Sequence, residues 1–319
     1  MRAIRVREFG DADRLLLEEV ETPVPAAGQV LVRVMAAGVN PVDTYIRSGT
    51  HSIRPALPYT PGKDAAGIVE AVGEGVGIEV GTRVYTADSV TGTYAEFCLC
   101  NQDQVHELGE KISFEQGAGI FVPYATAYRA LFQKARAQNG ETVLIHGASG
   151  AVGIAAIQFA KRTGLKVIGT AGSPEGVELV TRTGADFAFN HSTEGYLHEI
   201  LAATEGVGVD IILEMLANEN LERDFDVLRK FGRIVVIGNR GSLQFTPRLA
   251  MSKDASIHGM VLFNASKEEM AQIHAAIAEG MACGVVDPVV EAVFKLEDAA
   301  DAHRAVIGRK ALGKLVLVP

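Results

Sequence analysis

Hydrophobic and polar positions divide the chain into two parts with different periods. Up to about residue 110, apolar and polar residues alternate over short stretches such as 4–7 and 30–34, and glycines bound the apolar runs at 68–72 and 94–99. Alternation with a period of two, closed by glycine turns, is typical of short strands. This part is therefore predicted to form a compact, antiparallel or barrel-like β domain.

From about residue 115, strand-like apolar runs alternate with helical segments. We expect strands at 142–146, 166–170, 187–190, 210–216 and 233–238, and helices at 152–163, 175–183 and 220–230. This order indicates βαβ units, and so a doubly wound parallel sheet with helices on both faces. The 142–146 strand is apolar on both faces, as a central strand should be.

The end of the chain changes pattern again. An apolar strand at 257–263, helices at 267–281 and 297–307 and a last strand, KLVLV, are predicted to lead back to the first domain. The expected organisation is thus one discontinuous domain of residues 1–119 and 263–319, and a second of residues 120–262.

Composition narrows the function classes. The chain has 319 residues, 48% hydrophobic and 22% charged, which is ordinary for a globular protein. Its net charge of −9, with no basic run, argues against nucleic acid as a partner. Cys98, Cys100 and Cys283 cannot form a disulfide framework, which favours a reducing, cytoplasmic location. Cys98 and Cys100 are predicted to be buried strand residues.

Two segments bear on membranes. The N-terminus carries charges throughout and has no apolar core, so no signal peptide is expected. Residues 142–160 lack Asp, Glu, Lys and Arg, but three glycines and polar residues interrupt them. A buried strand and helix joined by a tight turn is predicted there, and no membrane span.

The most informative segment is HGASGAVG, residues 146–153, between a predicted strand and a predicted helix. A dinucleotide fingerprint requires this context. Gly150 would let the backbone approach a pyrophosphate, and Gly153 would let the helix pack closely on the strand. Ala148 replaces the first glycine of the GxGxxG pattern. In this βαβ series the segment predicts a dinucleotide site, with phosphate held at the helix N-terminus.

The choice of dinucleotide depends on the tip of the second strand. An NAD enzyme normally has Asp or Glu there, whereas this chain has Ala171 and Gly172, followed by Ser173. A 2′-phosphate would meet no carboxylate and could accept a hydrogen bond from Ser173. Arg240 and His191 are candidate cations. NADPH is therefore favoured over NADH.

These segments, taken together, resemble a known family. AAGVNPVDTYIRSG (36–49), LPYTPGKDAAG (57–67), PYATAYRAL (123–131) and GETVLIHGASGAVG (140–153) occur in the order found in the zinc-free quinone oxidoreductases of the medium-chain dehydrogenase/reductase superfamily, ζ-crystallin type. The resemblance implies a GroES-like catalytic domain, a Rossmann domain, a cleft between them, and an NADPH:quinone reductase that is a homodimer or homotetramer.

The resemblance also predicts that no metal is used. Zinc-dependent relatives place a Cys in the early loop and a His-Glu pair in the second segment. Here those positions are Asn40, Lys63 and Asp64. Catalytic zinc needs three protein ligands drawn from Cys, His and carboxylates, and only Asp64 qualifies.

Without a Lewis acid, the expected reaction is hydride transfer to an electron-poor acceptor, a quinone or an enone. Tyr45 and Asn40 are implied to lie beside the nicotinamide, Tyr59 to form a wall and Thr126 to contact the carboxamide. Plain alternatives are an edge aromatic for Tyr45, a turn residue for Asn40, packing for Tyr59 and an intrahelical hydrogen bond for Thr126.

The remaining cofactor residues follow predicted strands. Asn220 could instead be only the N-cap of a helix that begins at Leu221, and Arg240 a solvated surface residue. The cofactor-contacting residues predicted in addition to Tyr45 and Thr126 are Ser149, Gly150, Ala151, Val152, Gly172, Ser173, His191, Asn218, Asn220, Ile237, Gly238, Asn239, Arg240, Val261, Leu262 and Phe263.

Two other functions stay open on the sequence. One is reduction of 2-alkenals, enones or enoyl thioesters by the same hydride donor. The other is a non-catalytic NADPH-binding role, crystallin-like or RNA-binding, although the charge and the lack of an arginine-rich segment argue against RNA.

Overall fold

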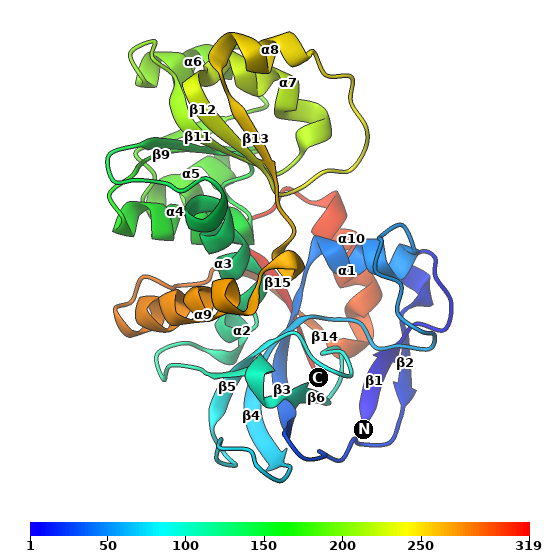
Figure 1. The fold of residues 1–319 in the computed structure, drawn as a ribbon. Helices are drawn as coiled ribbons and strands as arrows, with labels where there is room; N and C mark the ends of the chain where they lie inside the picture. The colour runs from blue at the N-terminus through cyan, green and yellow to red at the C-terminus, as the bar shows by residue number, and fades with distance from the viewer. The chain divides into compact units, whose positions relative to one another are not determined.

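The computed structural model describes all 319 residues, which form two compact units (Figure 1). The first unit consists of residues 1–122, 287–309 and 313–319, and the second of residues 123–286 and 310–312. The chain first passes from one unit to the other after Val122, three residues beyond the predicted domain boundary between residues 119 and 120.

The first unit is built on a seven-stranded sheet. Its strands lie in the order β14-β15-β3-β4-β5-β7, with β6 paired to β3; all pairs are antiparallel except β14 with β15. The strands of this unit are β1 (Arg2–Arg5), β2 (Leu16–Glu19), β3 (Gln29–Val39), β4 (Asp64–Val72), β5 (Arg83–Ala87), β6 (Phe97–Asn101), β7 (Val105–Glu107), β14 (Val290–Lys295) and β15 (Lys314–Val318).

Two helices of the first unit, α2 (Phe114–Gly117) and α10 (Ala299–Gly308), pack on this sheet, and α1 (Pro41–Ser48) packs on α10. Short 3₁₀ turns lie at Ala12–Arg14, Gln102–Gln104 and Leu296–Asp298. The core joins alternate residues of β3 and β6 to Leu296 and one face of α10. Cys98 and Cys100 are fully buried on β6, which confirms their prediction as strand residues.

The second unit is a six-stranded parallel sheet in the order β10-β9-β8-β11-β12-β13. Its strands are β8 (Thr142–Ile145), β9 (Lys166–Ala171), β10 (Phe187–Asn190), β11 (Val209–Glu214), β12 (Leu228–Val236) and β13 (Ser256–Gly259). This is the Rossmann order, with the reversal between β8 and β11. Side chains 143–145 of β8 are fully buried, as predicted for a central strand. The predicted fold class is thus confirmed.

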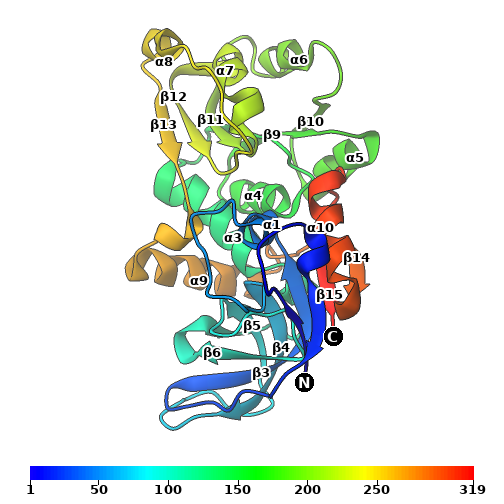
Figure 2. The same ribbon diagram turned by 90° about the vertical axis from the view of Figure 1, so that its right-hand side faces the viewer.

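Helices cover both faces of the parallel sheet (Figures 1 and 2). The helices are α3 (Phe121–Tyr128), followed by a π-helical segment Arg129–Lys134, α4 (Ala151–Arg162), α5 (Pro174–Thr183), α6 (Tyr196–Ala203), α7 (Ala217–Val227), α8 (Pro247–Lys253) and α9 (Lys267–Ala282), with a 3₁₀ turn at Leu262–Asn264. The uncharged stretch 142–160 is β8, a turn and α4, and no helix of the protein is both long and apolar enough to cross a membrane.

Several predicted element boundaries are wrong. The strand expected at 233–238 is β12, which begins five residues earlier at Leu228 and ends at Val236. The helix expected at 220–230 is α7, which begins three residues earlier and stops at Val227, because Leu228 already pairs with Val209 in the sheet. The strand expected at 257–263 is β13, which ends at Gly259, and the chain then turns into the 3₁₀ segment.

Residues 263–286 lie in the second unit, although the sequence analysis placed them in the first domain. The reason is the packing of α9. Its Ile273 and Ile277 are fully buried, and its Glu269 accepts a 2.6 Å hydrogen bond from the buried guanidinium of Arg129. Helical periodicity gives the buried face of α9 but does not say which unit covers it.

Candidate functional site

The turn between β8 and α4 forms the centre of the candidate nucleotide site. Gly147 adopts a left-handed conformation (φ +57°), and Gly150 is the residue before the first turn of α4. Ala148 has an ordinary backbone conformation, so its methyl group is tolerated, because the left-handed residue is Gly147. The amides of Ala151 and Val152 lie in the first helical turn, where the helix offers them no acceptor.

Packing requires glycine at position 153, whereas glycine at position 150 leaves space for a ligand. A methyl carbon on Gly153 would lie 2.5 Å from Cα of Ala148, so the close packing of α4 on the turn requires glycine. A methyl carbon on Gly150 would meet only the Gly147 carbonyl oxygen at 3.4 Å and Cβ of Ala311 at 3.6 Å. The protein itself therefore tolerates a side chain at position 150, and the space in front of it is available to a ligand.

The tip of β9 lies next to this turn. Ser173 is the N-cap of α5, where its Oγ accepts a hydrogen bond from the amide of Gly176. A methyl carbon on Gly176 would lie 3.2 Å from Oγ of Ser149, so the N-termini of α4 and α5 are neighbours. Ser149 itself donates a 2.7 Å hydrogen bond to the carbonyl oxygen of Ala311.

Lys310 is a residue that the sequence analysis missed. A methyl carbon on Gly172 would lie 3.6 Å from Cδ of Lys310 and 3.0 Å from Nε2 of His191, so both residues flank the tip of β9. Burial lowers the pKa of His191, and the charges of His146 and Lys310 lower it further. The ring of His191 is therefore neutral near pH 7, and Lys310 supplies the positive charge at this place. Lys310 is about 140 residues from Gly172 in the chain, so no local pattern could point to it.

The loops after β11 and β12 are tied together. Asn218 accepts a 2.9 Å hydrogen bond from the amide of Arg240, and the amides of Ile237 and Gly238 donate to the carbonyl oxygen of Glu214. Asn218 and Asn220 both lie inside α7, which begins at Ala217, so Asn220 is not an N-cap. Its side chain donates to Glu214 instead.

All predicted cofactor residues of the second unit except Thr126 follow the carboxyl ends of the six parallel strands. Because such ends share one edge of a sheet, ligands of this fold bind there. Residues 149–152 follow β8, residues 172–173 follow β9, His191 follows β10, Asn218 and Asn220 follow β11, residues 237–240 follow β12, and residues 261–263 follow β13. Thr126 is buried on α3, and its hydroxyl makes no hydrogen bond to the preceding turn.

A buried charged cluster lies directly behind the nucleotide turn. Nε2 of His146 is 2.9 Å from Oδ1 of Asp224 and 3.7 Å from Oε2 of Glu214, and Nδ1 is 3.3 Å from Oγ1 of Thr170. Burial raises the pKa of Glu214 to about 7, and Asp224 adds to the rise. Burial opposes charge on His146, but Asp224 and Glu214 outweigh it and raise the pKa of the imidazole.

These three residues could also serve as metal ligands, since their ligand atoms lie within 4.8 Å of one another. Protons account for the geometry more simply. Oε2 of Glu214 and Oδ2 of Asp224 are buried without another partner, and a single proton shared between the two carboxyl groups would satisfy both. We therefore interpret the cluster as a proton-sharing support for the ends of β8 and β11.

In the first unit, the candidate catalytic residues are distributed over separate places. Asn40 precedes α1 and is buried, Tyr45 is half-buried on α1 and lines a groove of about 590 Å³, and Tyr59 lines a different cavity of about 310 Å³. Backbone hydrogen bonds in both directions with Val6 hold Tyr59 in place. The structure thus brings Tyr45 and Asn40 onto one helix start but gives Tyr59 its own pocket.

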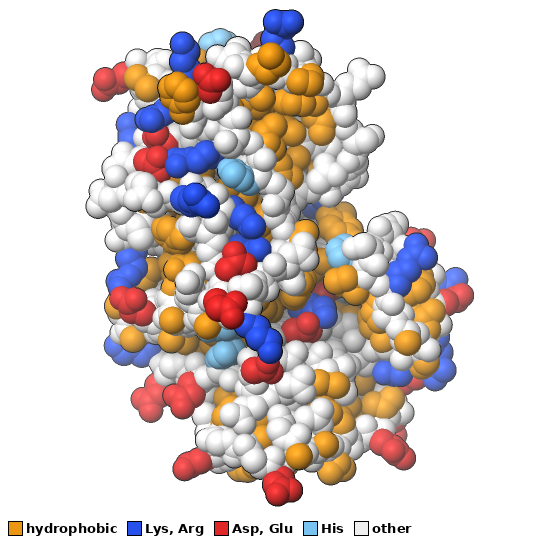
Figure 3. Space-filling model, in the orientation of Figure 1, with side chains coloured by type: hydrophobic (Ala, Val, Ile, Leu, Met, Phe, Trp, Pro, Cys, Tyr) orange, Lys and Arg blue, Asp and Glu red, His pale blue; other side chains and the backbone are white.

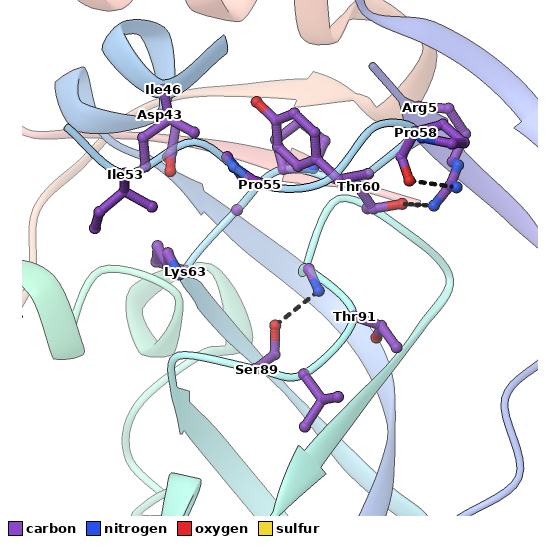
Figure 4. Close-up of a pocket in the computed structure, with 15 residues that line it drawn as sticks. Arg5, Asp43, Ile46, Ile53, Pro55, Pro58, Thr60, Lys63, Ser89 and Thr91 are labelled. Carbon is purple, nitrogen blue, oxygen red and sulfur yellow. Dashed lines mark hydrogen bonds between the residues drawn. The ribbon is translucent and has the colours of Figure 1, made fainter. Parts of the chain in front are cut away.

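The 310 Å³ cavity has mostly apolar walls with a few polar groups. Figure 4 shows Asp43 and Ile46 from α1 facing Ile53 and Lys63, with Ser89 and Thr91 on the opposite wall. Nζ of Lys63 is held 2.9 Å from Oδ1 of Asp88. A pocket with an apolar lining and a small number of polar side chains is typical of a small-molecule site.

Comparison with known proteins identifies the family. Residues 26–153 match the family model "Alcohol dehydrogenase GroES-like domain", and residues 151–279 match "Zinc-binding dehydrogenase". The chain is 48% identical to human quinone oxidoreductase over all of this chain and 98% of that protein. The chain belongs to the quinone oxidoreductase family of the medium-chain dehydrogenase/reductase superfamily, ζ-crystallin type.

Solved structures agree with this assignment. Quinone oxidoreductase of Escherichia coli in complex with NADPH is 30% identical, with a TM-score of 0.89 and full coverage of both chains. A mycobacterial protein complexed with NADPH is 29% identical, also over the full length of both chains, with a TM-score of 0.91. The family resemblance seen in the sequence is confirmed.

One of the matched family models is named for zinc binding, so the residues at the zinc-ligand positions of such relatives decide whether a metal fits here. Nζ of Lys314 lies 2.6 Å from Oδ1 of Asn40 and 2.8 Å from Oδ2 of Asp64, and all three side chains are buried. Asn40 also donates a 3.0 Å hydrogen bond to Asp64. An ammonium group already satisfies these oxygens, and a divalent cation would be repelled by it. The residues present do not fit a zinc site.

The same substitution at the two glycines of the turn should separate packing from ligand binding. Gly153→Ser should lower the free energy of unfolding by about 1–3 kcal/mol, because its Cβ would overlap Ala148. Gly150→Ser should change it by less than about 0.5 kcal/mol, since Ser is a preferred N-cap, yet weaken NADPH binding roughly tenfold or more. Denaturant unfolding and NADPH fluorescence titration check both; equal losses of stability would contradict the assignment.

The proton-sharing cluster predicts a pH-dependent stability. Glu214 titrates near pH 7 when folded but near 4.5 when unfolded, so the folded state binds more protons in this window and stability falls as pH rises through it. The raised pKa of His146 acts in the same direction from pH 6.5 upward. Glu214→Gln, whose amide can donate to Asp224, should flatten this dependence by up to about 3 kcal/mol.

The measurement is urea unfolding between pH 4.5 and 8, with Glu178→Gln, an exposed carboxylate of the same unit, as the control. If Glu214→Gln and Glu178→Gln keep the same pH slope as the original chain, the shared proton is not there.

Proposed function

We propose that the protein is an NADPH-dependent, zinc-independent quinone oxidoreductase. The full-length similarity to quinone oxidoreductases supports the reaction class. The observation that carries the rest is the buried Asn40–Asp64–Lys314 cluster, which occupies the ligand positions of zinc-dependent relatives with an ammonium group. Without a Lewis acid to stabilise an alkoxide, the favoured acceptor is one that is already electron-poor.

NADPH, when bound, supplies the hydride. The first amides of α4 would bind the pyrophosphate, because they have no acceptor within the helix, and Gly150 leaves room for it at the helix N-terminus. Lys310, Ser173 and His191 at the tip of β9 would bind the adenosine ribose and its 2′-phosphate. Tyr45, Thr126 and residues 261–263 remain predicted contacts of the nicotinamide half.

The acceptor would occupy the 310 Å³ cavity of the first unit. Ile46, Ile53 and Tyr59 offer apolar and aromatic surface to a flat ring, and Lys63 and Thr60 are within the lining for carbonyl oxygens. The cavity is small for a long isoprenoid tail, so short quinones fit this proposal best.

The finer predictions on assembly and location belong to the same proposal. β13 is an edge strand, and Ile257 on it is 40% exposed, near exposed Met251 and Val261; Figure 3 shows hydrophobic side chains gathered over β13 and α8. Edge pairing of two β13 strands would give a homodimer, the unit of a homotetramer. The buried thiols of Cys98 and Cys100, with sulfur atoms 3.9 Å apart and unbridged, support a reducing, cytoplasmic location.

A steady-state screen tests the function directly. NADPH should be oxidised in the presence of short ortho- and para-quinones, more slowly with enones, and at the same rate after dialysis against a chelator. NADPH binding with no oxidation by any acceptor would favour the non-catalytic role, and activity lost to chelation and restored by zinc would overturn the metal-free proposal.

Lys310→Met should weaken NADPH binding about tenfold or more and NADH binding less than twofold, because only NADPH carries the 2′-phosphate that a cation recognises. Arg240→Ala, the candidate from the sequence, serves as the comparison. Fluorescence titration with both nucleotides measures the ratio, and a larger selective loss in Arg240→Ala would transfer the role to Arg240.

A further inference from the structure

A chain of three buried titratable side chains joins the acceptor cavity of the first unit to a second, open groove. Oδ2 of Asp43 lies 3.2 Å from Oη of Tyr94, and this oxygen lies 3.1 Å from Nε2 of His303. Asp43 lines the 310 Å³ cavity, and His303 lines the 590 Å³ groove. All three residues are at most 3% exposed, so water does not compete within the chain.

We propose that Asp43 is the proton donor to the reduced acceptor, and that Tyr94 and His303 pass it a replacement proton from the groove. The inference rests on the proposed function, because it assigns the acceptor to this cavity. Figure 4 shows a carboxylate oxygen of Asp43 directed toward the part of the cavity bounded by Ile53 and Lys63.

The step balances as follows. Reduction of a quinone to a hydroquinone needs one hydride, which carries both electrons, and one proton. The O–H bond of the Asp43 carboxylic acid breaks, and an O–H bond forms on the acceptor oxygen. Asp43 is left as a carboxylate, then takes the hydroxyl proton of Tyr94, which takes the Nε2 proton of His303. As Nε2 of His303 releases its proton, Nδ1, the ring nitrogen without a partner in the protein, takes one from solvent in the groove. The ring then returns to its starting tautomer, so each turnover consumes one solvent proton.

The surroundings suit a carboxyl group that holds a proton near neutral pH. Burial raises the pKa of Asp43 to about 7, and the negative charge of Asp64 contributes to the rise. The hydrogen bond from the amide of Asn40 and the positive charges of Lys314 and Lys63 lower this pKa, but by less. General acids work best when their pKa is close to the working pH.

The other members of the chain stay neutral. Burial, with Arg47 adding, lowers the pKa of His303 to about 3, and burial beside Asp43 raises the pKa of Tyr94. Each can therefore pass on a proton only while it receives one. The rings of Tyr94 and His303 meet edge to face with centroids 5.6 Å apart, which fixes this contact.

Tyr59 is the competing donor, since its buried hydroxyl makes no hydrogen bond and lines the same cavity. Burial raises its pKa further, with Asp43 adding, so it is the weaker acid. It has no link to a group that could resupply its proton. Asp43 has that link through Tyr94.

The test uses the full-length enzyme with a series of substituted benzoquinones whose hydroquinone anions differ in basicity. Asp43→Asn keeps the hydrogen-bonding shape but holds no acidic proton. It should lower kcat about 10²-fold or more for the most basic hydroquinones and progressively less for weakly basic ones, with NADPH affinity unchanged. Tyr94→Phe should lower kcat less, and an added small weak acid should restore it. Tyr85→Phe, a buried tyrosine that lines neither cavity, is the control.

The proposal is overturned if Asp43→Asn lowers kcat equally for all quinones of the series, or if Tyr85→Phe lowers kcat as much as Asp43→Asn does. It is also overturned if the loss of kcat grows with hydroquinone basicity in Tyr59→Phe but not in Asp43→Asn.

Infrared titration of the cofactor-free protein gives an independent readout. Glu214→Gln serves as the background, because Glu214 is the other carboxyl group with a pKa raised to about 7. In that background, a carboxylic acid band present at pH 6 and lost toward pH 8 should be missing once Asp43→Asn is added; if the band persists, Asp43 is not the protonated group. If Asp43→Asn fails to fold, His303→Gln should lower kcat by a similar factor for every quinone of the series, because it slows only the return of a proton to Asp43. An added small weak acid should restore this loss, and absence of rescue would overturn the relay. If the original chain reduces no quinone, the proposed function fails, whereas the infrared result still judges Asp43.

Discussion

The antiparallel pairing of β15 with β3 is the constraint on which the candidate sites depend. Leu315, Val316 and Leu317 pair with Val39, Gly38 and Ala37, and the buried apolar residues of both strands hold the C-terminus in the sheet. Three functional groups come from the last residues of the chain, and Lys314, at the start of β15, is the one that this pairing positions directly. Lys314 reaches Asn40 and Asp64, Lys310 reaches the tip of β9, and His303 on the preceding helix reaches Tyr94.

The buried ion pair of Lys314 and Asp64 shows how closely this packing is adjusted. A methyl carbon on Gly38 would lie 2.6 Å from Cε of Lys314, so glycine in β3 leaves the path that the lysine side chain follows. Two buried charges cost desolvation energy, and breaking such a pair by removing one partner costs about 3–5 kcal/mol. The cost is offset here because Asn40 and the amide of Val122 complete the hydrogen bonds of the pair. An enzyme that relied on zinc would need these oxygens for the metal.

The two units divide the chemical work according to their architecture. In the parallel sheet, free amides and a fixed cation gather at the carboxyl ends of the strands, which suits recognition of a phosphorylated cofactor. In the antiparallel unit, the cavity and the groove are lined by side chains from loops and short helices, which suits recognition of a small acceptor and control of protons. Asp43 belongs to the second kind of site, and its burial gives an ordinary carboxyl group the acidity of a physiological proton donor.

The sequence alone determined the Rossmann fold and the nucleotide turn, because these depend on local periodicity and on glycines at fixed spacing within 146–153. The family came from a resemblance carried by several motifs in the family's order along the chain. The sequence also placed most of the predicted cofactor residues after strands, and the parallel sheet brought them to one edge. It did not find Lys310, Lys314, Tyr94 or His303, and it assigned α9 to the wrong unit. These residues act across separations of about 140, 274, 51 and 209 positions. Only tertiary packing joins groups so far apart, since burial and long-range pairing leave no periodic mark on the chain.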